Sequence, residues 1–470
     1  MKVIFNNTSV GFHSIILASQ SFHRHTNGQL QPSVRSAFTH CKKYLCAGLL
    51  AICSLLMLSS CSVTKQISKQ ADNVLLKDSA ISTGHIGISI YEPATNSYWY
   101  NYDATKYFVP ASNTKLFSLY AGLKYLGDSL PGIRYEVDKD SNLLIQPTGD
   151  PTFLHPEFSQ PVYQFLSSYK KITFTNGKFT DDFLGRGWAW DDYKESYMTQ
   201  RSNFPIYGNL ITIKKNGNDI SFSPGNVQYY FADKTNLKDG FDIEKKWDEN
   251  LIGITGGTNQ RLYVPITPNT TDIINMLQDT LHLTVIPEPD NTRKLKNLFR
   301  SQPSDSLFKP MMHRSDNFYA EQTLLMAGNE LLGYMNDGKM IDTLLSTDMK
   351  DIPQKPKWVD GSGLSRYNLF TPQSFVYILH KMRNEFGLER LKNILPTGGE
   401  GTITAYYKKD AGFIFAKTGT LSNHCALSGF IITKKNKLLI FSVLANHYQT
   451  GATPVRRAVE KFLSAIREKY

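Results

Sequence analysis

The chain has 470 residues, of which 41% are hydrophobic and 20% are charged. This composition excludes an intrinsically disordered protein, and the length predicts two or three domains. The net charge is +11, but residues 1–60 hold five basic and no acidic residues, so the other 410 residues carry only +6. A charge that dilute argues against a nucleic-acid-binding protein, whose basic residues gather on one face or arm.

Cysteine use and short motifs exclude several enzyme classes. Of the five cysteines, Cys61 and Cys425 alone lie beyond the N-terminal apolar stretch, so the rest of the chain can build neither a disulfide framework nor a cysteine-based zinc site. The sequence also has no P-loop, no His-Glu-x-x-His and no Gly-x-Ser-x-Gly motif. We therefore expect chemistry that uses no metal and no cofactor.

The N-terminus has the pattern of an export signal over residues 1–60. Lys42 and Lys43 precede an uncharged run that ends in Leu58-Ser59-Ser60-Cys61, as in a secretory signal with small residues before the cleavage site. This ending resembles the bacterial lipobox, which implies that Cys61 is lipidated. An uncleaved membrane anchor is the alternative. Residues 1–41 are too long for an ordinary n-region, so we expect translation to start downstream.

The mature chain is predicted to be an α/β (α+β) domain split by an insertion. Residues 61–130 and 305–470 form the split domain, an antiparallel sheet flanked by N- and C-terminal helices. Its expected elements are a hairpin at 85–91 and 98–100, helices at 112–123, 319–332 and 455–466, and strands at 413–418, 427–432 and 438–443.

The insertion, residues 131–304, is predicted to be β-rich. Short strands are expected at 171–175, 210–213 and 220–222, and Asn216-Gly217 predicts a hairpin between the last two. One helix is expected at 271–281.

Ser-x-x-Lys is the first of three motifs that suggest one site. It occurs five times, but only the copy at Ser112 and Lys115 opens a predicted helix directly after an extended segment. There the hydroxyl faces the positive end of the helix dipole and the amine lies one turn along the same face. The copy at Ser306 is expected in a loop, and those at Ser167 and Ser168 precede a strand.

The other two motifs are ambiguous when each is considered alone. Ser315-Asp316-Asn317 opens a predicted helix and is more simply explained as an N-cap. Lys417-Thr418-Gly419-Thr420 follows the strand that ends at Ala416, where a turn glycine is equally plausible. All three motifs in this order, each on the expected element, favour a catalytic site.

A serine hydroxyl needs a base, and no histidine is placed to serve, so Lys115 is the candidate base. At its reference pKa of about 10.4, only about one lysine in 2,500 is neutral at pH 7. We expect burial and the nearby Lys417 cation to lower the pKa of Lys115, leaving it partly neutral.

The three motifs together resemble those of penicillin-binding proteins and class A β-lactamases. Ser112 and Ser315 are 203 positions apart, which leaves room for a large insertion. In this respect the chain is similar to the D-alanyl-D-alanine carboxypeptidase/endopeptidase family of class C, low-molecular-mass penicillin-binding proteins. That resemblance implies the fold of a transpeptidase-like domain with inserted accessory domains. It extends over about 85–470 and includes the stretches 149–152, 187–192, 315–322, 360–366 and 417–421.

The resemblance also implies roles for the motif residues. Ser315 would relay the proton to the leaving amine, and Asn317 would bind the substrate amide. The terminal carboxylate would be held by Lys417 and Thr418, Gly419 would allow close approach of the peptide, and the backbone N–H groups of Ser112 and Thr420 would form the oxyanion hole.

Five residues outside the three motifs also have expected roles. Asp150 is favoured as a turn residue over a contact with a cationic stem-peptide side chain. Asp360 and Arg366 are expected to shape their loop. His424 and Cys425 stand where small or apolar residues are expected after the strand that carries Lys417. They are interpreted as packed strand residues or as part of the pocket rim.

The sequence therefore predicts an exported, lipid-anchored serine peptidase in the periplasm or cell-wall space. It would cleave D-Ala-D-Ala ends or D-Ala cross-links of peptidoglycan through a Ser112 acyl-enzyme, and β-lactams would acylate the same serine. A β-lactamase-like hydrolase on the same scaffold and a catalytically idle lipoprotein that binds cell wall are the alternatives. Whether the protein forms a homodimer, and which stem-peptide residue it prefers, is left open.

Overall fold

The computed structural model describes residues 63–470, except 218, 226, 233–236 and 289–292. The predicted export signal and Cys61 lie outside the described residues. Residues 66–470 form one compact unit. Among the described helices, none combines the length and the apolar character that a bilayer-spanning segment requires.

The main sheet has five antiparallel strands in the order β14-β15-β16-β1-β2. Its strands are β1 (His85–Glu92), β2 (Ser97–Tyr102), β14 (Ile414–Leu421), β15 (His424–Ile432) and β16 (Leu438–Asn446). Strand β1 pairs with β16, so one ladder joins segments that are more than 300 residues apart in the sequence. The predicted hairpin and all three predicted C-terminal strands are confirmed.

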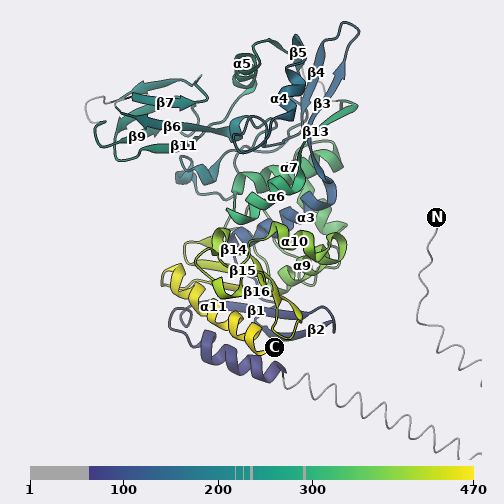
Figure 1. Ribbon diagram of the computed structural model, residues 1–470, viewed down its shortest axis with the longest axis vertical. Helices are drawn as coiled ribbons and strands as arrows, with labels where there is room; N and C mark the ends of the chain where they lie inside the picture. The colour runs from purple at the N-terminus through teal and green to yellow at the C-terminus, as the bar shows by residue number, and fades with distance from the viewer. Residues whose placement is uncertain (1–62, 218, 226, 233–236, 289–292) are drawn as a thin grey trace, which may run out of the picture. The chain divides into compact units, whose positions relative to one another are not determined.

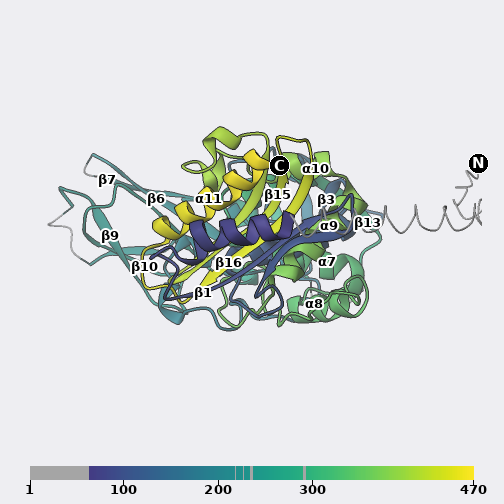
Figure 2. The same ribbon diagram turned by 90° about the horizontal axis from the view of Figure 1, so that it is seen from below.

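Helices cover both faces of this sheet. The amphipathic helix α11 (Ala452–Lys469) packs on β15 and lies beside η1 (Asp72–Leu76) on the same face (Figures 1 and 2). The other face carries α9 (Pro372–Phe386), which packs on β16, β1 and β15.

A helical layer with a continuous apolar core lies above α9. It contains α3 (Lys115–Tyr125), α6 (Ser304–His313), α7 (Asn317–Leu332), α8 (Asp337–Ser346) and α10 (Leu388–Ile394). Leu119 of α3, Phe308 of α6 and Leu324 of α7 are all buried in this core. The loop expected around Ser306 is wrong, because Ser306 and Lys309 belong to α6.

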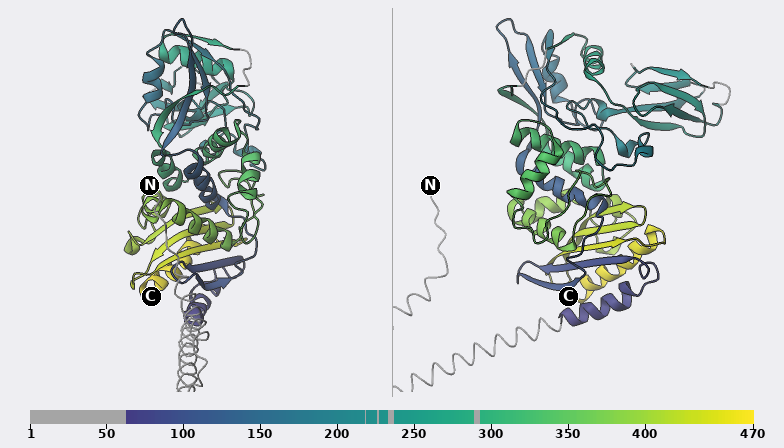
Figure 3. Two further views of the ribbon diagram at one scale, coloured as in Figure 1. Left: turned by 90° about the vertical axis from the view of Figure 1, so that its right-hand side faces the viewer. Right: turned by 180° about the vertical axis from the view of Figure 1, so that it is seen from behind.

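The helical layer separates the main sheet from a second sheet (Figures 1 and 3). That five-stranded sheet has the order β12-β5-β4-β3-β13, with parallel pairs at β4-β5 and β5-β12. Its members are β3 (Ser129–Val137), β4 (Leu143–Pro147), β5 (Lys171–Phe174), β12 (Thr284–Pro287) and β13 (Asn297–Pro303), with α4 (Pro161–Leu166) and α5 (Thr270–Leu281) nearby in the chain.

Two three-stranded sheets complete the inserted segment. One has the order β11-β6-β7 and the other β8-β10-β9. The predicted hairpin through Gly217, whose φ is +63°, is confirmed between β6 and β7. The strands are β6 (Leu210–Asn216), β7 (Asp219–Ser223), β8 (Tyr229–Phe231), β9 (Phe241–Lys245), β10 (Ile252–Gly256) and β11 (Arg261–Pro265).

The inserted segment has its own apolar core, formed by buried residues between Ile133 and Val285. The core of the helical layer takes buried residues from outside 131–304. We therefore propose that 131–304 is an accessory region inserted into the split domain. Six short 3-10 turns connect the elements: η2 (Ala111–Thr114), η3 (Trp190–Asp192), η4 (Ser196–Met198), η5 (Tyr207–Asn209), η6 (Gly401–Ile403) and η7 (Lys408–Asp410).

Candidate active site

Ser112 lies in a tight turn that leads directly into a buried helix. The turn is η2, and α3 begins at Lys115 rather than at Ser112 as the sequence predicted. Ala111 enters the turn with φ of +47°, in the left-handed region that a residue with a side chain seldom adopts. The turn leaves Ser112 half-buried and places Lys115 one turn further along the chain.

The ammonium group of Lys115 has three oxygen neighbours and no solvent exposure. Its Nζ lies 2.9 Å from Ser112 Oγ, 2.6 Å from Asn317 Oδ1 and 2.7 Å from the backbone oxygen of Ser362. Amide and peptide oxygens can only accept, whereas a hydroxyl can also donate. When Lys115 loses a proton, its two remaining N–H groups stay on Asn317 and Ser362, and its lone pair faces the serine hydroxyl.

Burial lowers the pKa of Lys115 to about 8, while the negative charges of Asp360, Glu321 and Asp316 oppose that shift. About one tenth of the amine is then neutral at pH 7. The predicted direction is confirmed, but the expected contribution of Lys417 is not found. Instead, burial and then the charge of Lys115 lower the pKa of Lys417.

The Ser315-Asp316-Asn317 segment is both a helix cap and part of the site. Asp316 is the N-cap of α7, and its Oδ1 accepts a hydrogen bond of 3.0 Å from the Tyr319 N–H. This cap places Ser315 and Asn317 on either side of it. Ser315 Oγ accepts from Lys417 at 2.8 Å, and Asn317 reaches Lys115. The N-cap explanation and the catalytic explanation are therefore compatible.

Residues 417–420 lie inside strand β14, not at its end as the sequence predicted. Side chains alternate along a strand, so Lys417 and Gly419 share one face. Lys417 is buried and donates to Ser315 Oγ and to the Thr418 oxygen, both at 2.8 Å. A Cβ on Gly419 would lie 2.5 Å from the Pro110 oxygen and 3.1 Å from the Ser112 nitrogen, so the strand can pass this close to the turn only with glycine.

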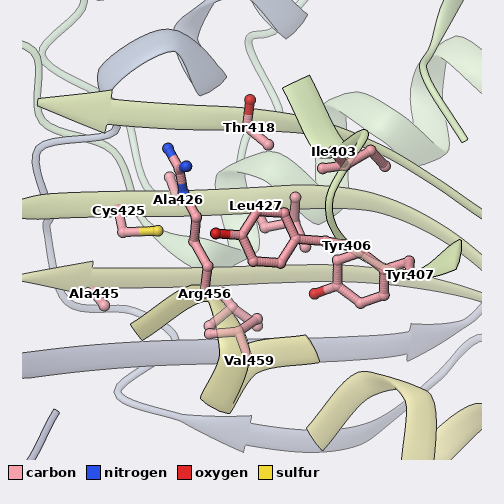
Figure 4. Close-up of a pocket in the computed structure, with 11 residues that line it drawn as sticks. Ile403, Tyr406, Tyr407, Thr418, Cys425, Ala426, Leu427, Ala445, Arg456 and Val459 are labelled. Carbon is pink, nitrogen blue, oxygen red and sulfur yellow. The ribbon is translucent and has the colours of Figure 1, made fainter. Parts of the chain in front are cut away.

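The opposite face of β14 borders a small cavity (Figure 4). Thr418, Cys425 and Arg456 line it, and Arg456 of α11 also donates to Thr420 Oγ1. Burial raises the pKa of the Cys425 thiol. Because Thr420 and Cys425 are paired across the ladder, Cys425 shares the face of Thr420 and points away from Lys417.

His424 and Asp150 have structural surroundings. His424 Nδ1 lies 2.7 Å from the Ser422 oxygen and 3.2 Å from Arg366. Asp150 is buried and accepts from the Thr152 N–H at 2.9 Å and from the Ser301 hydroxyl, as a turn residue does. Burial raises the pKa of Asp150 to about 6.

Sequence reasoning missed several contributors to the site. The Ser362 backbone oxygen holds Lys115, and a backbone acceptor has no residue-type signal. Glu321 is buried four residues after Asn317 on α7, and its Oε1 accepts from the Ser362 N–H at 2.7 Å. Helical spacing from Asn317 could have indicated Glu321. The inserted segment also lines a groove beside Ser315 and Asn317 through His155, Tyr197, Tyr207 and Tyr263.

A family model described as the D-Ala-D-Ala carboxypeptidase 3 (S13) family matches residues 67–466. The chain belongs to this family. As an S13 peptidase it is a serine D-Ala-D-Ala carboxypeptidase, a penicillin-binding hydrolase of cell-wall metabolism.

Two relatives are named as carboxypeptidases, and a solved structure shares the fold. D-alanyl-D-alanine carboxypeptidase DacB of Haemophilus influenzae is 24% identical in an alignment of 413 positions that covers 75% of this chain and 83% of the relative. The D-alanyl-D-alanine carboxypeptidase of Actinomadura sp. is 24% identical over 82% of this chain and 81% of its own length. The crystal structure of penicillin binding protein 4 from H. influenzae is 19% identical in sequence and matches with a TM-score of 0.68. The match covers 86% of this chain and 99% of that structure, so the two proteins share the fold.

Proposed function

We propose that Ser112 is the nucleophile of this S13 peptidase and Lys115 its general base. The observation that supports this proposal is the set of three oxygens around Lys115 Nζ. The oxygens of Asn317 and Ser362 can only accept, so each keeps one N–H group of Lys115. The lone pair of the neutral amine is therefore directed at the Ser112 hydroxyl, which has a proton to give.

The acylation step follows from this geometry. Ser112 Oγ attacks the carbonyl carbon of the penultimate D-Ala while its proton moves to Lys115 Nζ. The backbone N–H groups of Ser112 and Thr420 stabilise the oxyanion, and each such donor contributes about 2.7–4 kcal/mol. The C–N bond then breaks, and Ser315 relays to the departing D-Ala amine the proton that Lys115 took from Ser112, so that Lys115 is neutral again. Water attacks the acyl-enzyme to release the shortened peptide.

We propose that Lys417 holds the terminal carboxylate of the substrate. The resemblance gave Thr418 the same role, but its side chain lies on the opposite face of β14 and donates to Thr402 Oγ1 at 2.7 Å. Lys417 is buried, and its Nζ contacts the Ser315 hydroxyl, so a carboxylate bound there forms a charge-assisted hydrogen bond beside the proton relay. Asn317 would bind the substrate amide, and Gly419 would leave room for the peptide along β14.

Labelling with a fluorescent penicillin tests this assignment. We expect one covalent adduct, located at Ser112 by peptide mass spectrometry, and no labelling of Ser112→Ala. Lys115→Ala should be labelled at least about a hundredfold more slowly, because removal of a general base costs about 10²–10⁴ in rate. An adduct on another residue, or wild-type labelling of Lys115→Ala, would contradict the proposal.

We further propose that the enzyme cleaves both D-Ala-D-Ala ends and D-Ala cross-links of peptidoglycan. Mass spectrometry of purified muropeptides after incubation separates the two activities, because loss of one D-Ala leaves cross-linked dimers intact and cross-link cleavage converts them to monomers. Failure of Ser112→Ala to abolish both products would contradict a shared site.

We propose that the protein is exported and anchored through a lipid on Cys61, which lies outside the described residues. The supporting evidence is the Leu58-Ser59-Ser60-Cys61 sequence after an uncharged run. Mass spectrometry of the N-terminal peptide should show a diacylglyceryl group on Cys61, and a free thiol at this position in the membrane-bound protein would refute the anchor.

A further inference from the structure

The inserted segment contacts the supports of both oxygens that hold Lys115. One of these oxygens is Asn317 Oδ1. The nitrogen of the same side-chain amide, Nδ2, fixes the orientation of the group. Asn317 Nδ2 donates to the backbone oxygen of Tyr197, in η4, at 2.8 Å. Because the amide nitrogen is bound to Tyr197, the amide oxygen is turned toward Lys115.

The second oxygen belongs to Ser362, whose peptide group is held from both sides. Its oxygen accepts from Lys115 at 2.7 Å, and its N–H donates to Glu321 Oε1 at 2.7 Å. The other carboxylate oxygen of Glu321 lies 3.5 Å from the guanidinium of Arg201, a residue of the insertion that is only 2% exposed.

Arg201 is fixed by further contacts, some within the insertion and one with Asp337 at the start of α8. It pairs with Asp181 at 3.1 Å and with Asp337, and it donates to the backbone oxygens of Asp182 and Leu184. A buried charge pair of this kind adds little net stability compared with an apolar contact, so its value lies in fixing positions.

Trp188 supports the same loop from a second point. Its Nε1 donates to Asp360 Oδ2 at 2.9 Å. Asp360 in turn accepts from the N–H groups of Gly363 and Ser365, at 2.8 and 2.7 Å, and so closes the loop that carries Ser362. The Arg201 guanidinium lies 5.9 Å from the centre of a Trp188 ring, so the two residues are neighbours.

We propose that Trp188 and Arg201 of the inserted segment are positioning residues for acylation, acting through Asp360 and Glu321 to hold the acceptors that aim the lone pair of Lys115 at Ser112. This inference rests on the proposed role of Lys115. It gives the insertion a part in the chemistry: the split domain supplies the reacting groups, and residues 188–201 fix their geometry.

Electrostatics provide a readout that a purely structural role would not change. The charged groups that face Lys115 are Glu321 and Asp316 of α7, Asp360 of the loop and Lys417 of β14. Glu321 favours protonated Lys115, and Arg201 favours ionised Glu321 against the effect of burial. Loss of the Glu321 charge therefore lowers the pKa of Lys115.

The chain offers a matched control for Arg201. Arg134 of β3 is a second buried arginine of the insertion, and it pairs at 2.7 Å with Glu330, near the far end of the same helix α7. Glu330 is nine residues beyond Glu321, about 13 Å along the helix. Arg201→Lys and Arg134→Lys both keep the charge and lose the planar fork of donors.

The test is the second-order rate constant of acylation by a fluorescent penicillin, measured with the melting temperature of each variant. We expect the rate constants of Arg201→Lys and Trp188→Phe to be at least about tenfold lower than that of wild type, because small misplacements of reacting groups are costly. Arg134→Lys should stay within about twofold of wild type. In Glu321→Gln the rise of acylation with pH should move to lower pH.

Three results would overturn the inference: equal acylation of Arg201→Lys and Arg134→Lys, unchanged acylation of Trp188→Phe, or an unmoved pH profile in Glu321→Gln. Should Arg201→Lys not fold, Trp188→Phe and Glu321→Gln still decide the question. A wild-type enzyme that is not labelled on Ser112 would instead contradict the proposed function, so the two failures are distinguishable.

Discussion

Lys115 makes acylation depend on pH in a defined direction. Its pKa of about 8 means that the neutral base increases from about a tenth at pH 7 to about nine tenths at pH 9. We expect the rate constant of acylation by penicillin to rise about tenfold over this range. Rapid-mixing measurements between pH 6 and 10 test this expectation, and a flat profile would exclude Lys115 as the base.

Lys417→Arg is the control for the titrating group, because a guanidinium stays charged throughout this range. The variant should bind the substrate carboxylate more weakly but keep the same rise with pH. A profile that loses its rise in Lys417→Arg would assign the titration to Lys417 and not to Lys115.

At the scale of single residues, the sequence identifies the groups whose chemistry depends on a side chain. The predicted residues form two hydrogen-bonded groups. Lys115 joins Ser112 to Asn317, and Lys417 contacts Ser315. The backbone oxygens of Ser362 and Tyr197 could not be predicted, because any residue type supplies the same atom and only the folded chain places it.

At the scale of elements, the cap of α7 connects helix stability to the site. Asp316→Ala removes the acceptor for the Tyr319 N–H and should lower the free energy of unfolding by about 1 kcal/mol. Because the cap lies between Ser315 and Asn317, acylation should slow as well. The matched control is Asn269→Ala at the N-cap of α5, where Asn269 accepts from Asp272 at 2.9 Å.

Urea denaturation and penicillin labelling of both variants separate the two effects. Asn269→Ala should lose comparable stability and keep wild-type acylation. Asp316→Asn, which retains a capping oxygen, should recover most of the lost stability. Equal acylation rates in Asp316→Ala and Asn269→Ala would show that the cap does not position the site.

The close approach of β14 to the η2 turn gives a second prediction at this scale. Gly419→Ala places a methyl group 2.5 Å from the Pro110 oxygen, so the strand or the turn must move, at a cost of about 1–3 kcal/mol. Acylation should fall about a hundredfold, since the Ser112 nitrogen lies 3.1 Å from the same point. Gly225→Ala, which meets no atom within 4 Å, is the control, and equal behaviour of the two variants would contradict this account.

The elements that sequence reasoning placed wrongly show what local signals omit. Ser306 was expected in a loop, yet it belongs to α6, which continues through Pro310 because Leu307, Phe308 and Met311 are buried in the core. Tertiary packing of an apolar face supplies most of the stability of a helix, and here it outweighs the local cost of proline. Strand β14 similarly extends through residues 417–420 because its ladder with β15 continues to Leu421.

At the scale of the whole molecule, the sequence predicted an antiparallel main sheet flanked by helices, but neither the order of its strands nor the sheets of the insertion. Alternating apolar residues predicted its short strands, whereas the parallel pairs β4-β5 and β5-β12 join segments separated by long connections. Periodicity reports which face of a strand is buried, not which strand lies beside it. The contacts of residues 188–201 with α7 and the 360–365 loop were unpredictable for the same reason.

Buried acids should make the stability of the folded chain fall as pH rises. Asp150 has a pKa of about 6 in the folded protein and about 3.9 when unfolded, so the folded state holds its proton more tightly. Its contribution is fully present below about pH 4 and is lost as pH rises through 6, by up to about 3 kcal/mol. Asp150→Asn has no proton to lose, so its stability relative to wild type should be greater at pH 8 than at pH 4.

Urea midpoints at the two pH values measure this difference. Asp138→Asn serves as the control of opposite sign, because hydrogen bonds from Asn142 lower the pKa of the exposed Asp138 carboxylate. That variant should lose stability relative to wild type at pH 8 and not at low pH. A relative stability of Asp150→Asn that does not increase with pH would show that Asp150 is ionised in the folded state at pH 4, and the turn it closes would then accommodate a charge.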